Sequence, residues 1–346
     1  MNVSELYSLV HWIDDKIIAT EIPQKYQELQ VILQRNAQSN QQKAPFETQK
    51  DKLIGLLEDV PLYSLTKDQL NFLQELGIAQ AVGKEGKNSI EEILYINVID
   101  LATSAQKIQD ILQGLNKGIE KSNQIKQGLD GCVLFEEYES NNEILVRVSF
   151  TGHATMSNVS DFKKWGKFWY EIGRGITMVH DSSPEDVRIV GATNGSIVIE
   201  LAMIAGIATT ASGIILSALK VAEKVLDIKK KAEEIRNLKL RNKKLAKEIE
   251  KEADEERKAG IESITCLAIE ELNLNEETEG DKATAFAKAI KNLVSFIEYG
   301  GEVDFVLPED EDESAEDETT VDKYESLRVA FQEIRQLEDK IKLLEP

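Results

Sequence analysis

The chain has 346 residues, of which 42% are hydrophobic and 30% charged, and its formal net charge is −21 at pH 7. This length allows two or three domains with a sizeable core, and the composition is typical of a soluble, helix-rich protein. The acidic balance argues against free double-stranded DNA as a partner for the whole molecule. Cys132 and Cys266 are far apart in the sequence, so we expect a reduced, cytoplasmic setting.

The first 88 residues are expected to form short helices. Met1 to Ile18 lack the layout of a signal peptide, so export is not expected. Thr66 and Gln69 have the spacing of a capping box and predict a helix start.

Ser89 and Glu92 repeat the capping-box spacing and predict the start of a long helix over 89–128. The apolar residues of this helix alternate steps of four and three, as in a coiled-coil seam. They are Leu94, Val98, Leu101, Ala105, Ile108, Leu112, Leu115 and Ile119.

Residues 132–200 follow a different pattern, with runs rich in β-branched and aromatic residues. Asn194 and Gly195 separate two such runs, which is a strong hairpin signal. Five elements are expected in the order ββαββ: strands at 132–138 and 143–151, a helix at 161–179, and strands at 187–190 and 196–200. We therefore expect an α+β fold, mainly helical, in which long coiled-coil-forming helices join a small antiparallel ββαββ head module.

Residues 201–259 contain no proline, and no glycine follows Gly213 until Gly260. Because nothing interrupts a helix here, we predict one helix over the whole segment, about 90 Å long at 1.5 Å per residue. Such a helix cannot pack against a single compact core. It needs a partner chain, a membrane or another long helix of its own chain.

A heptad-like seam runs along this predicted helix, because apolar residues recur at alternating steps of four and three. After Ile235 the steps shift and place Asn242 at a buried a position, which favours a two-stranded dimer in fixed register. The alternative is that the helix packs against the 89–128 helix of its own chain and that Asn242 is solvated. The seam comprises Ile207, Ala211, Ile214, Ala218, Val221, Val225, Ile228, Ala232, Ile235, Leu238, Asn242, Leu245 and Ile249.

The first third of this helix, 201–219, carries no charged side chain and is long enough to span a bilayer. Two pairs of small residues could allow close helix packing, Ala202 with Gly206 and Thr209 with Gly213. Small and polar residues at its centre, and the missing aromatic belt, argue against constitutive spanning. Conditional insertion and burial inside a helical assembly both stay open, and the seam favours burial. An apolar segment beside long helices resembles the layout of α-helical pore-forming toxins, which implies insertion on a trigger.

The helix expected at 161–179 interleaves aromatic and basic residues. Such a face can stack on single-stranded nucleic acid or lie at a membrane interface. The alternative is that its aromatic residues simply cover the sheet. The candidate aromatic-basic face comprises Lys163, Lys164, Trp165, Lys167, Phe168 and Tyr170. Gly152 and His153 follow a strand and could line a small-ligand pocket above the sheet.

Signatures of catalysis are not found. The stretch from Gly83 to Ser89 resembles part of a phosphate-binding loop, but Ala81 occupies the position of its first glycine. Gly173 and Gly175 follow no expected strand, which rejects a dinucleotide-binding turn. The three histidines are scattered and neither cysteine has a nearby partner. We expect a non-enzymatic protein without a metal or cofactor.

The C-terminal part is expected to contain helices at 261–272 and 281–298, a strand at 302–307 and a final helix within 320–346. Residues 261–346 carry 24 acidic and 8 basic residues, a net charge of −16. Acidic residues occupy eight of the ten positions in 309–318, so we expect a solvated, disordered loop at 308–319.

Three functions follow, in order of preference. The first is a coiled-coil assembly or interaction protein, oligomeric with itself or with another helical protein, whose 132–200 module recognises a partner or ligand. The second is an oligomeric effector that inserts 201–219 into a membrane on activation. The third is a nucleotide or small-ligand sensor.

Overall fold

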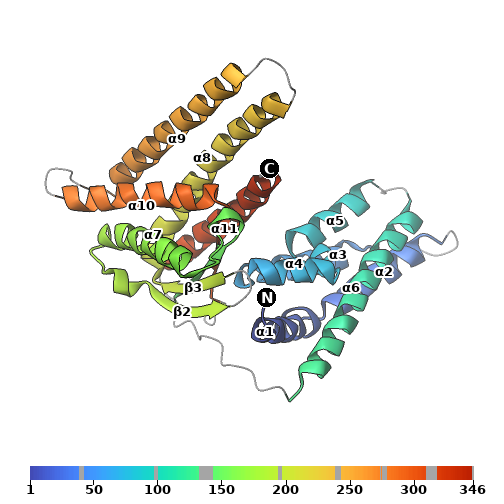
Figure 1. The fold of residues 1–346 in the computed structure, drawn as a ribbon. Helices are drawn as coiled ribbons and strands as arrows, with labels where there is room; N and C mark the ends of the chain where they lie inside the picture. The colour runs from blue at the N-terminus through green and yellow to red at the C-terminus, as the bar shows by residue number, and fades with distance from the viewer. Residues whose placement is uncertain are drawn as a thin grey trace. The chain divides into compact units, whose positions relative to one another are not determined.

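A computed structural model describes residues 1–38, 43–96, 100–131, 143–193, 197–237, 243–272, 274, 279–308 and 318–344. The chain divides into two compact units, Met1–Glu137 and Tyr138–Pro346 (Figure 1). The described residues are mostly helical, and their strands form one four-stranded antiparallel sheet in the second unit. The expected α+β, mainly helical class is therefore confirmed.

The N-terminal unit is a bundle in which α2 lies along α6. Its hydrophobic core includes the buried Tyr26. The Tyr26 hydroxyl donates a hydrogen bond to the Ala81 carbonyl oxygen, 2.8 Å away. Burial raises the pKa of the Tyr26 phenol. The helices are α1 (Val3–Ile13), followed by a π-helical turn (Asp14–Ile18), α2 (Ile22–Asn36), α3 (Glu47–Glu58), α4 (Lys67–Glu75), α5 (Gly83–Ile96) and α6 (Leu101–Leu129).

The two predicted capping boxes have different outcomes. Thr66 does cap α4, since its hydroxyl accepts the Gln69 N–H and the Gln69 side chain accepts the Thr66 N–H. The helix start predicted at Ser89 is wrong, because Ser89 lies inside α5. The glycine at Gly86 lets α5 begin earlier: a Cβ there would lie 2.6 Å from the Ala81 carbonyl carbon, a contact that only glycine allows.

The predicted 89–128 helix is therefore divided between α5 and α6, and Val98 lies outside the described residues. Asp100 caps α6 by accepting the N–H of Thr103, 3.1 Å away. The buried seam residues of α6, among them Ile108 and Leu115, belong to the core of the N-terminal unit itself. The four-three spacing here is thus explained by packing within one unit.

The C-terminal unit places helices around the sheet, whose strand order is β2-β3-β1-β4 (Figure 1). Helix α7 packs against α10, and α8 packs against α9, α10 and α11. The elements are β1 (Ile144–Phe150), α7 (Val159–Met178), β2 (Arg188–Thr193), β3 (Ile197–Met203), α8 (Ala205–Asn237), α9 (Lys243–Glu271), α10 (Gly280–Glu298), β4 (Glu302–Val306) and α11 (Glu318–Leu344).

The sheet contains three of the expected strands of the 132–200 module. Strands β2 and β3 pair antiparallel as the Asn194-Gly195 signal predicts, although residues 194–196 lie outside the described residues. The strand expected at 132–138 lies outside the described residues as well. Strand β4, expected from the sequence at 302–307, pairs with β1 and adds a fourth strand from a distant part of the chain.

The two faces of the sheet differ in chemistry. On one face Val146 and Val148 of β1 stand opposite Leu201 and Ile199 of β3, which makes an apolar surface. On the other face Arg147 stands between Glu200 and Asp304, in register across three strands. Arg335 of α11 donates to Asp304 over 2.7 Å and so extends this row of alternating charges.

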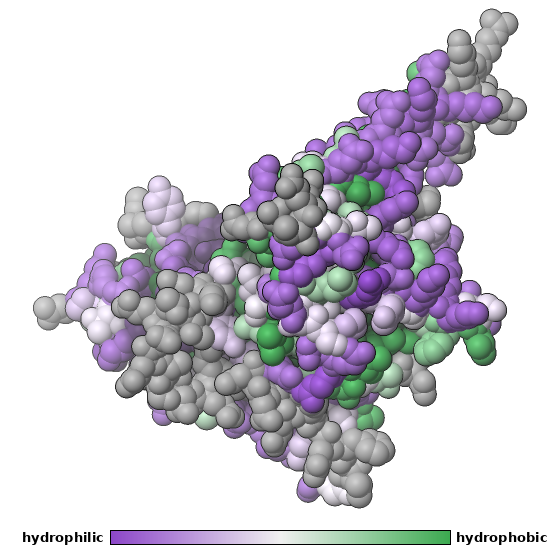
Figure 2. Space-filling view, turned by 90° about the vertical axis from the view of Figure 1, so that its left-hand side faces the viewer, coloured by the Kyte–Doolittle hydropathy of each residue, from purple (hydrophilic) through white to green (hydrophobic). Residues whose placement is uncertain are grey.

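The single helix predicted over 201–259 is wrong at both ends and in the middle. Residues 201–203 belong to β3, because this apolar run pairs with β1. Helix α8 then ends at Asn237, and α9 begins at Lys243 and lies beside it. Lys224 donates to Glu256 over 3.3 Å, so the two helices run antiparallel as a hairpin. Its surface is largely hydrophilic on the face that Figure 2 shows.

Gly260 does not end a helix, as the sequence suggested, but lies inside α9 at its contact with α8. A Cβ at Gly260 would lie 2.6 Å from Cγ2 of Val221. The predicted separate helix at 261–272 is therefore the continuation of α9. Helix α10 and strand β4 agree with the sequence predictions. Helix α11 begins at Glu318, so Glu318 and Thr319 belong to this helix rather than to the loop expected at 308–319, of which 309–317 lie outside the described residues.

The close contact at Gly260 can be tested with a matched pair of glycine substitutions. Gly260→Ala should lower the free energy of unfolding by about 1–3 kcal/mol, because the new methyl group overpacks the α8–α9 contact. Gly213→Ala should raise it by up to about 1 kcal/mol, since a Cβ at Gly213 meets open space and alanine favours the helix.

Chemical denaturation measures both values. Equal effects of the two substitutions would contradict the hairpin.

Candidate functional site

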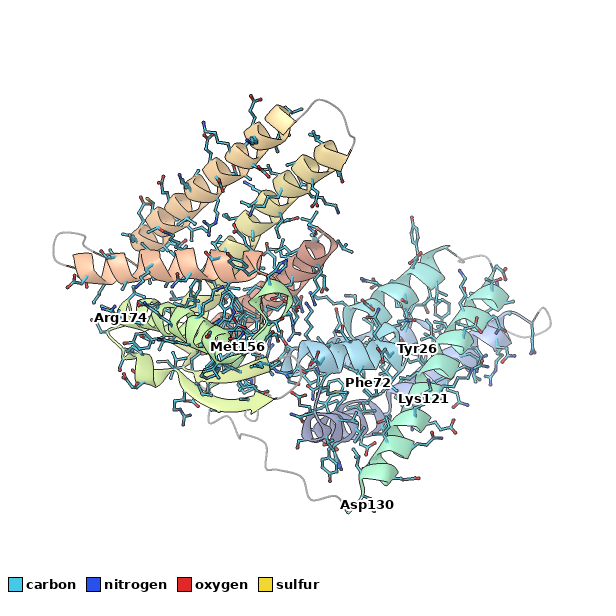
Figure 3. The ribbon with its side chains drawn as sticks, in the orientation of Figure 1. Tyr26, Phe72, Lys121, Asp130, Met156 and Arg174 are labelled. Carbon is cyan, nitrogen blue, oxygen red and sulfur yellow. The ribbon has the colours of Figure 1, made fainter. Side chains whose placement is uncertain are left out.

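A cavity of about 280 Å³ lies in the C-terminal unit between the apolar face of the sheet, helix α7 and the start of α8. Its floor is formed by β1, β2 and β3, and one wall by Ile207, Ala211 and Ile215 of α8. Met156, in the connection from β1 to α7, also lines it and lies between α7 and the sheet (Figure 3). The cavity is thus built entirely from one unit.

The lining is almost wholly apolar. Of the described side chains that line the cavity, only those of Trp169 and Tyr170 carry a nitrogen or oxygen atom. The others are Val146, Val148, Phe150, Met156, Phe162, Ile172, Ile176, Pro184, Val187, Ile189, Ile199, Leu201, Met203, Ile207, Ala211 and Ile215, with Gly166 and Gly173. Such walls favour an apolar ligand group over a charged one.

Two glycines keep the α7 side of the cavity open. A Cβ at Gly166 or Gly173 would meet no atom within 4 Å, although both residues line the cavity. Gly175, on another side of the same helix, is needed for packing, since a Cβ there would lie 2.5 Å from that of Ala289 in α10. Glycine inside a helix costs about 1 kcal/mol relative to alanine. At Gly166 and Gly173 no close contact requires glycine, and the absence of a side chain leaves space in the cavity.

The mouth of the cavity exposes three large hydrophobic side chains. Phe162, Tyr170 and Ile189 are 58%, 57% and 70% exposed and all line the cavity. They come from α7 and β2, which lie on either side of the opening. Exposed large apolar residues that gather at one cavity are typical of a binding site.

The predicted aromatic-basic face is divided by the structure. Trp165 is buried, 5.5 Å from the ring of Phe296 and 5.2 Å from that of Phe168. Lys164 lies over the Trp165 ring at 4.4 Å. Trp165 and Phe168 therefore anchor α7 to the unit, while Lys163, Lys167 and Tyr170 are exposed.

The seam predicted in 201–259 is buried within the C-terminal unit over its first half. The buried members are Ile207, Ala211, Ile214, Ala218, Val221, Val225 and Ala232. Ile228 and Ile235 are half-buried, Ile249 is half-buried on α9, and Leu245 is 41% exposed. Leu238 and Asn242 lie outside the described residues, so the dimer through Asn242 stays a prediction.

The small residues predicted to allow close helix packing do not do so here. Ala202 is in β3 rather than in a helix. A Cβ at Gly206 or Gly213 would meet nothing within 4 Å, and the Thr209 hydroxyl donates to the Ala205 carbonyl oxygen of its own helix. These positions face away from the neighbouring helices of the unit.

A second cavity of about 240 Å³ lies beside β4 and is lined in part by Gly152. Glu302 and Lys342, which form an ion pair 2.9 Å long, also line it, with the buried Glu338. Glu338 accepts the N–H of Val303 over 2.7 Å, so its carboxylate serves to cap the edge strand. His153, which we expected beside Gly152 in a pocket, is exposed.

His180 connects the end of α7 to the start of α8. Its Nε2 lies 2.8 Å from the Thr210 hydroxyl oxygen. Burial lowers the pKa of the His180 imidazole, and the charge of Asp181 partly offsets this effect. Asp181 has a positive φ of 54° and pairs with Lys282 of α10 over 2.6 Å.

Sequence reasoning missed the cavity itself. The signal that could have found it is the pair Gly166 and Gly173, two turns apart on the apolar stripe of a helix. Among the described residues, no group of three or more histidine, cysteine or acidic side chains could hold a metal ion. No protein family, curated protein or solved structure matches this chain, so the cavity is the basis for proposing a function.

The His180 contact predicts a pH dependence. Because the folded-state pKa is below the ordinary value of 6.5, the unfolded state binds the proton first as the pH falls. The stabilisation that the neutral His180 side chain gives the folded state is full above about pH 6.5 and is lost as the pH falls towards the folded-state pKa. Between pH 7.5 and 5.0 the melting temperature of the wild type should therefore fall more than that of His180→Gln. His153→Gln, an exposed control, should behave as the wild type does.

Proposed function

We propose that the protein is a non-enzymatic binding protein whose C-terminal unit holds an apolar ligand group between the sheet and α7. The observation that carries this proposal is the apolar cavity of about 280 Å³, with an exposed hydrophobic mouth. Gly166 and Gly173 line this cavity without a side chain, and a Cβ at either position would meet no atom within 4 Å, so they support a cavity that has room for a ligand.

The size of the cavity suits a small molecule better than a protein segment. An engineered apolar cavity of about 150 Å³ binds benzene, and ligand pockets begin at roughly 300 Å³. The lining supplies walls rather than reactive groups, since only Trp169 and Tyr170 carry polar atoms. Binding, rather than a reaction, is the role that these side chains support.

Self-association is a secondary part of the proposal. The heptad-like spacing of α8 is accounted for within one chain, where Ala211, Ala218 and Val225 are buried. Exposed Leu245 and Leu267 on α9 are the apolar residues that support contact with another helical protein. We therefore place any such contact on the outer side of the hairpin.

The second candidate function is conditional membrane insertion. Residues Ala205–Ile235 of α8 are long and apolar enough to cross a membrane, with a mean hydropathy of 1.5 in the relevant window. In the folded unit 56% of that window is buried, so the helix already satisfies the requirement for apolar surroundings. Core helices of soluble proteins have the same properties, which makes this candidate the weaker one.

Filling the cavity tests the first proposal. Gly173→Leu should lower the affinity for the small neutral dye 1-naphthylamine at least about tenfold, because the new side chain occupies the apolar space that the dye requires. Its melting temperature should be equal or higher, since leucine favours the helix.

Gly213→Leu adds the same side chain at an open position of α8 away from the cavity, and should bind the dye as the wild type does. Fluorescence titration measures all three proteins. Unchanged dye binding in a folded Gly173→Leu protein would contradict the proposal.

Liposome flotation tests the second candidate. Thr209 and Gly213 are exposed, so a Thr209→Lys/Gly213→Lys variant should fold as the wild type does. Each lysine would add about 3 kcal/mol to the free energy of insertion. The wild type should float with vesicles and the variant should remain below. Absence of the wild type from the floated fraction would reject membrane insertion.

A further inference from the structure

Two parallel stripes run along α7. The first comprises Phe162, Gly166, Trp169 and Gly173, at steps of four, three and four, and all four residues line the cavity. The second is displaced by one residue, about 100° further round the helix, and comprises Lys163, Lys167, Tyr170 and Arg174. We call this second set the basic stripe. Tyr170 belongs to it and also lines the cavity, so the basic stripe borders the mouth.

The basic stripe carries three positive charges and no acidic residue. All four of its side chains are exposed, and Arg174 lies towards the outer end of α7 (Figure 3). The one acidic residue near it on the helix, Glu171, accepts a hydrogen bond from Lys288 of α10 over 2.8 Å. That contact lowers the pKa of the Glu171 carboxyl. Arg174 is 3.9 Å from Glu171, at the limit of an ion pair.

The other side of the mouth carries acidic residues. Pro184 and Val187 line the cavity there, and the two residues between them are acidic. Asp186 accepts the N–H of Ser183 over 2.8 Å, and Glu185 accepts its hydroxyl proton. Both carboxylates are therefore held in the turn that begins at Ser183. The mouth thus has an acidic side at this turn and a basic side on α7, where Lys163, Lys167 and Arg174 are exposed to solvent.

We infer that the ligand is a single-chain amphiphile with an anionic headgroup, a carboxylate or a phosphate, whose chain fills the cavity and whose headgroup lies on the basic stripe beside Tyr170, between Lys167 and Arg174. This inference rests on the proposed function and adds the chemical class of the ligand. If about 150 Å³ holds the six carbons of benzene, then the present cavity holds roughly eleven. A chain of about ten carbons therefore matches the apolar volume.

The arrangement separates two contributions to binding. Burial of the chain supplies the larger part of the affinity, because each buried methylene raises the affinity about fourfold. Charge-assisted hydrogen bonds from the basic stripe supply the choice of headgroup. Because the basic stripe is exposed to solvent, this choice should weaken as the salt concentration rises.

Competition with the neutral dye measures the choice of headgroup. Decanoate, decyl phosphate, 1-decanol and decyltrimethylammonium share one chain length and differ in charge. Decanoate or decyl phosphate should displace the dye from the wild type at about tenfold lower concentration than decyltrimethylammonium. The comparison of decanoate with decyl phosphate distinguishes a fatty acid from a phosphorylated lipid as the source of the anion.

A matched pair of variants assigns the effect to the basic stripe. Lys163→Gln/Lys167→Gln/Arg174→Gln should bring the anionic and cationic ligands within twofold to threefold of each other, while dye binding is retained. Lys247→Gln/Lys251→Gln/Lys258→Gln removes the same charge from exposed positions of α9 and should keep the wild-type preference.

Equal displacement of the dye from the wild type by all four ligands would overturn the inference and leave the proposed function intact. Failure of the wild type to bind the dye would overturn both.

Discussion

The C-terminal unit depends on covering one apolar face of a four-stranded sheet. Helix α7 covers it only in part, because the two sides of the helix are packed differently. On one side Trp165 and Gly175 bring it against α10, with Gly175 in a contact that no larger residue permits. On the other side Gly166 and Gly173 present no side chain to the sheet. Close packing on one side and absent side chains on the other leave an apolar space that opens at the mouth.

The uncharged start of α8 is explained by the same requirement. Ile207 and Ala211 are buried and form a wall of the cavity, while Ala218 and Leu219 are buried further along the helix. A segment that must contact the sheet, α10 and α11 within one unit cannot carry charge on those sides. Its composition therefore has a cause in the folded protein. Only the exposed positions, such as Gly206 and Gly213, are free of that constraint.

Local signals in the sequence predicted local structure well, and failed where packing between distant segments decides. The Thr66 capping box and strand β4 were predicted because short-range patterns specify them. The end of α8 at Asn237 was not predicted, since no proline or glycine marks it. Gly260 was misinterpreted because a helix stop and a close helix contact both select glycine. The seam in α8 predicted burial correctly but not the partner, because a four-three spacing is the same for contacts within and between chains. The cavity depends on missing side chains, which leave no hydrophobic pattern.

Strand β3 ends at Met203 and α8 begins at Ala205, so the floor of the cavity and the hairpin are parts of one nearly continuous segment. Helix α8 has 33 residues and is therefore about 50 Å long. Because α8 also packs against α9, α10 and α11, the wall of the cavity and one side of the hairpin are the same helix. A substitution at Ile207 or Ala211 would therefore alter the cavity, whereas one beyond Leu219 would alter only the packing of α8 against its neighbouring helices.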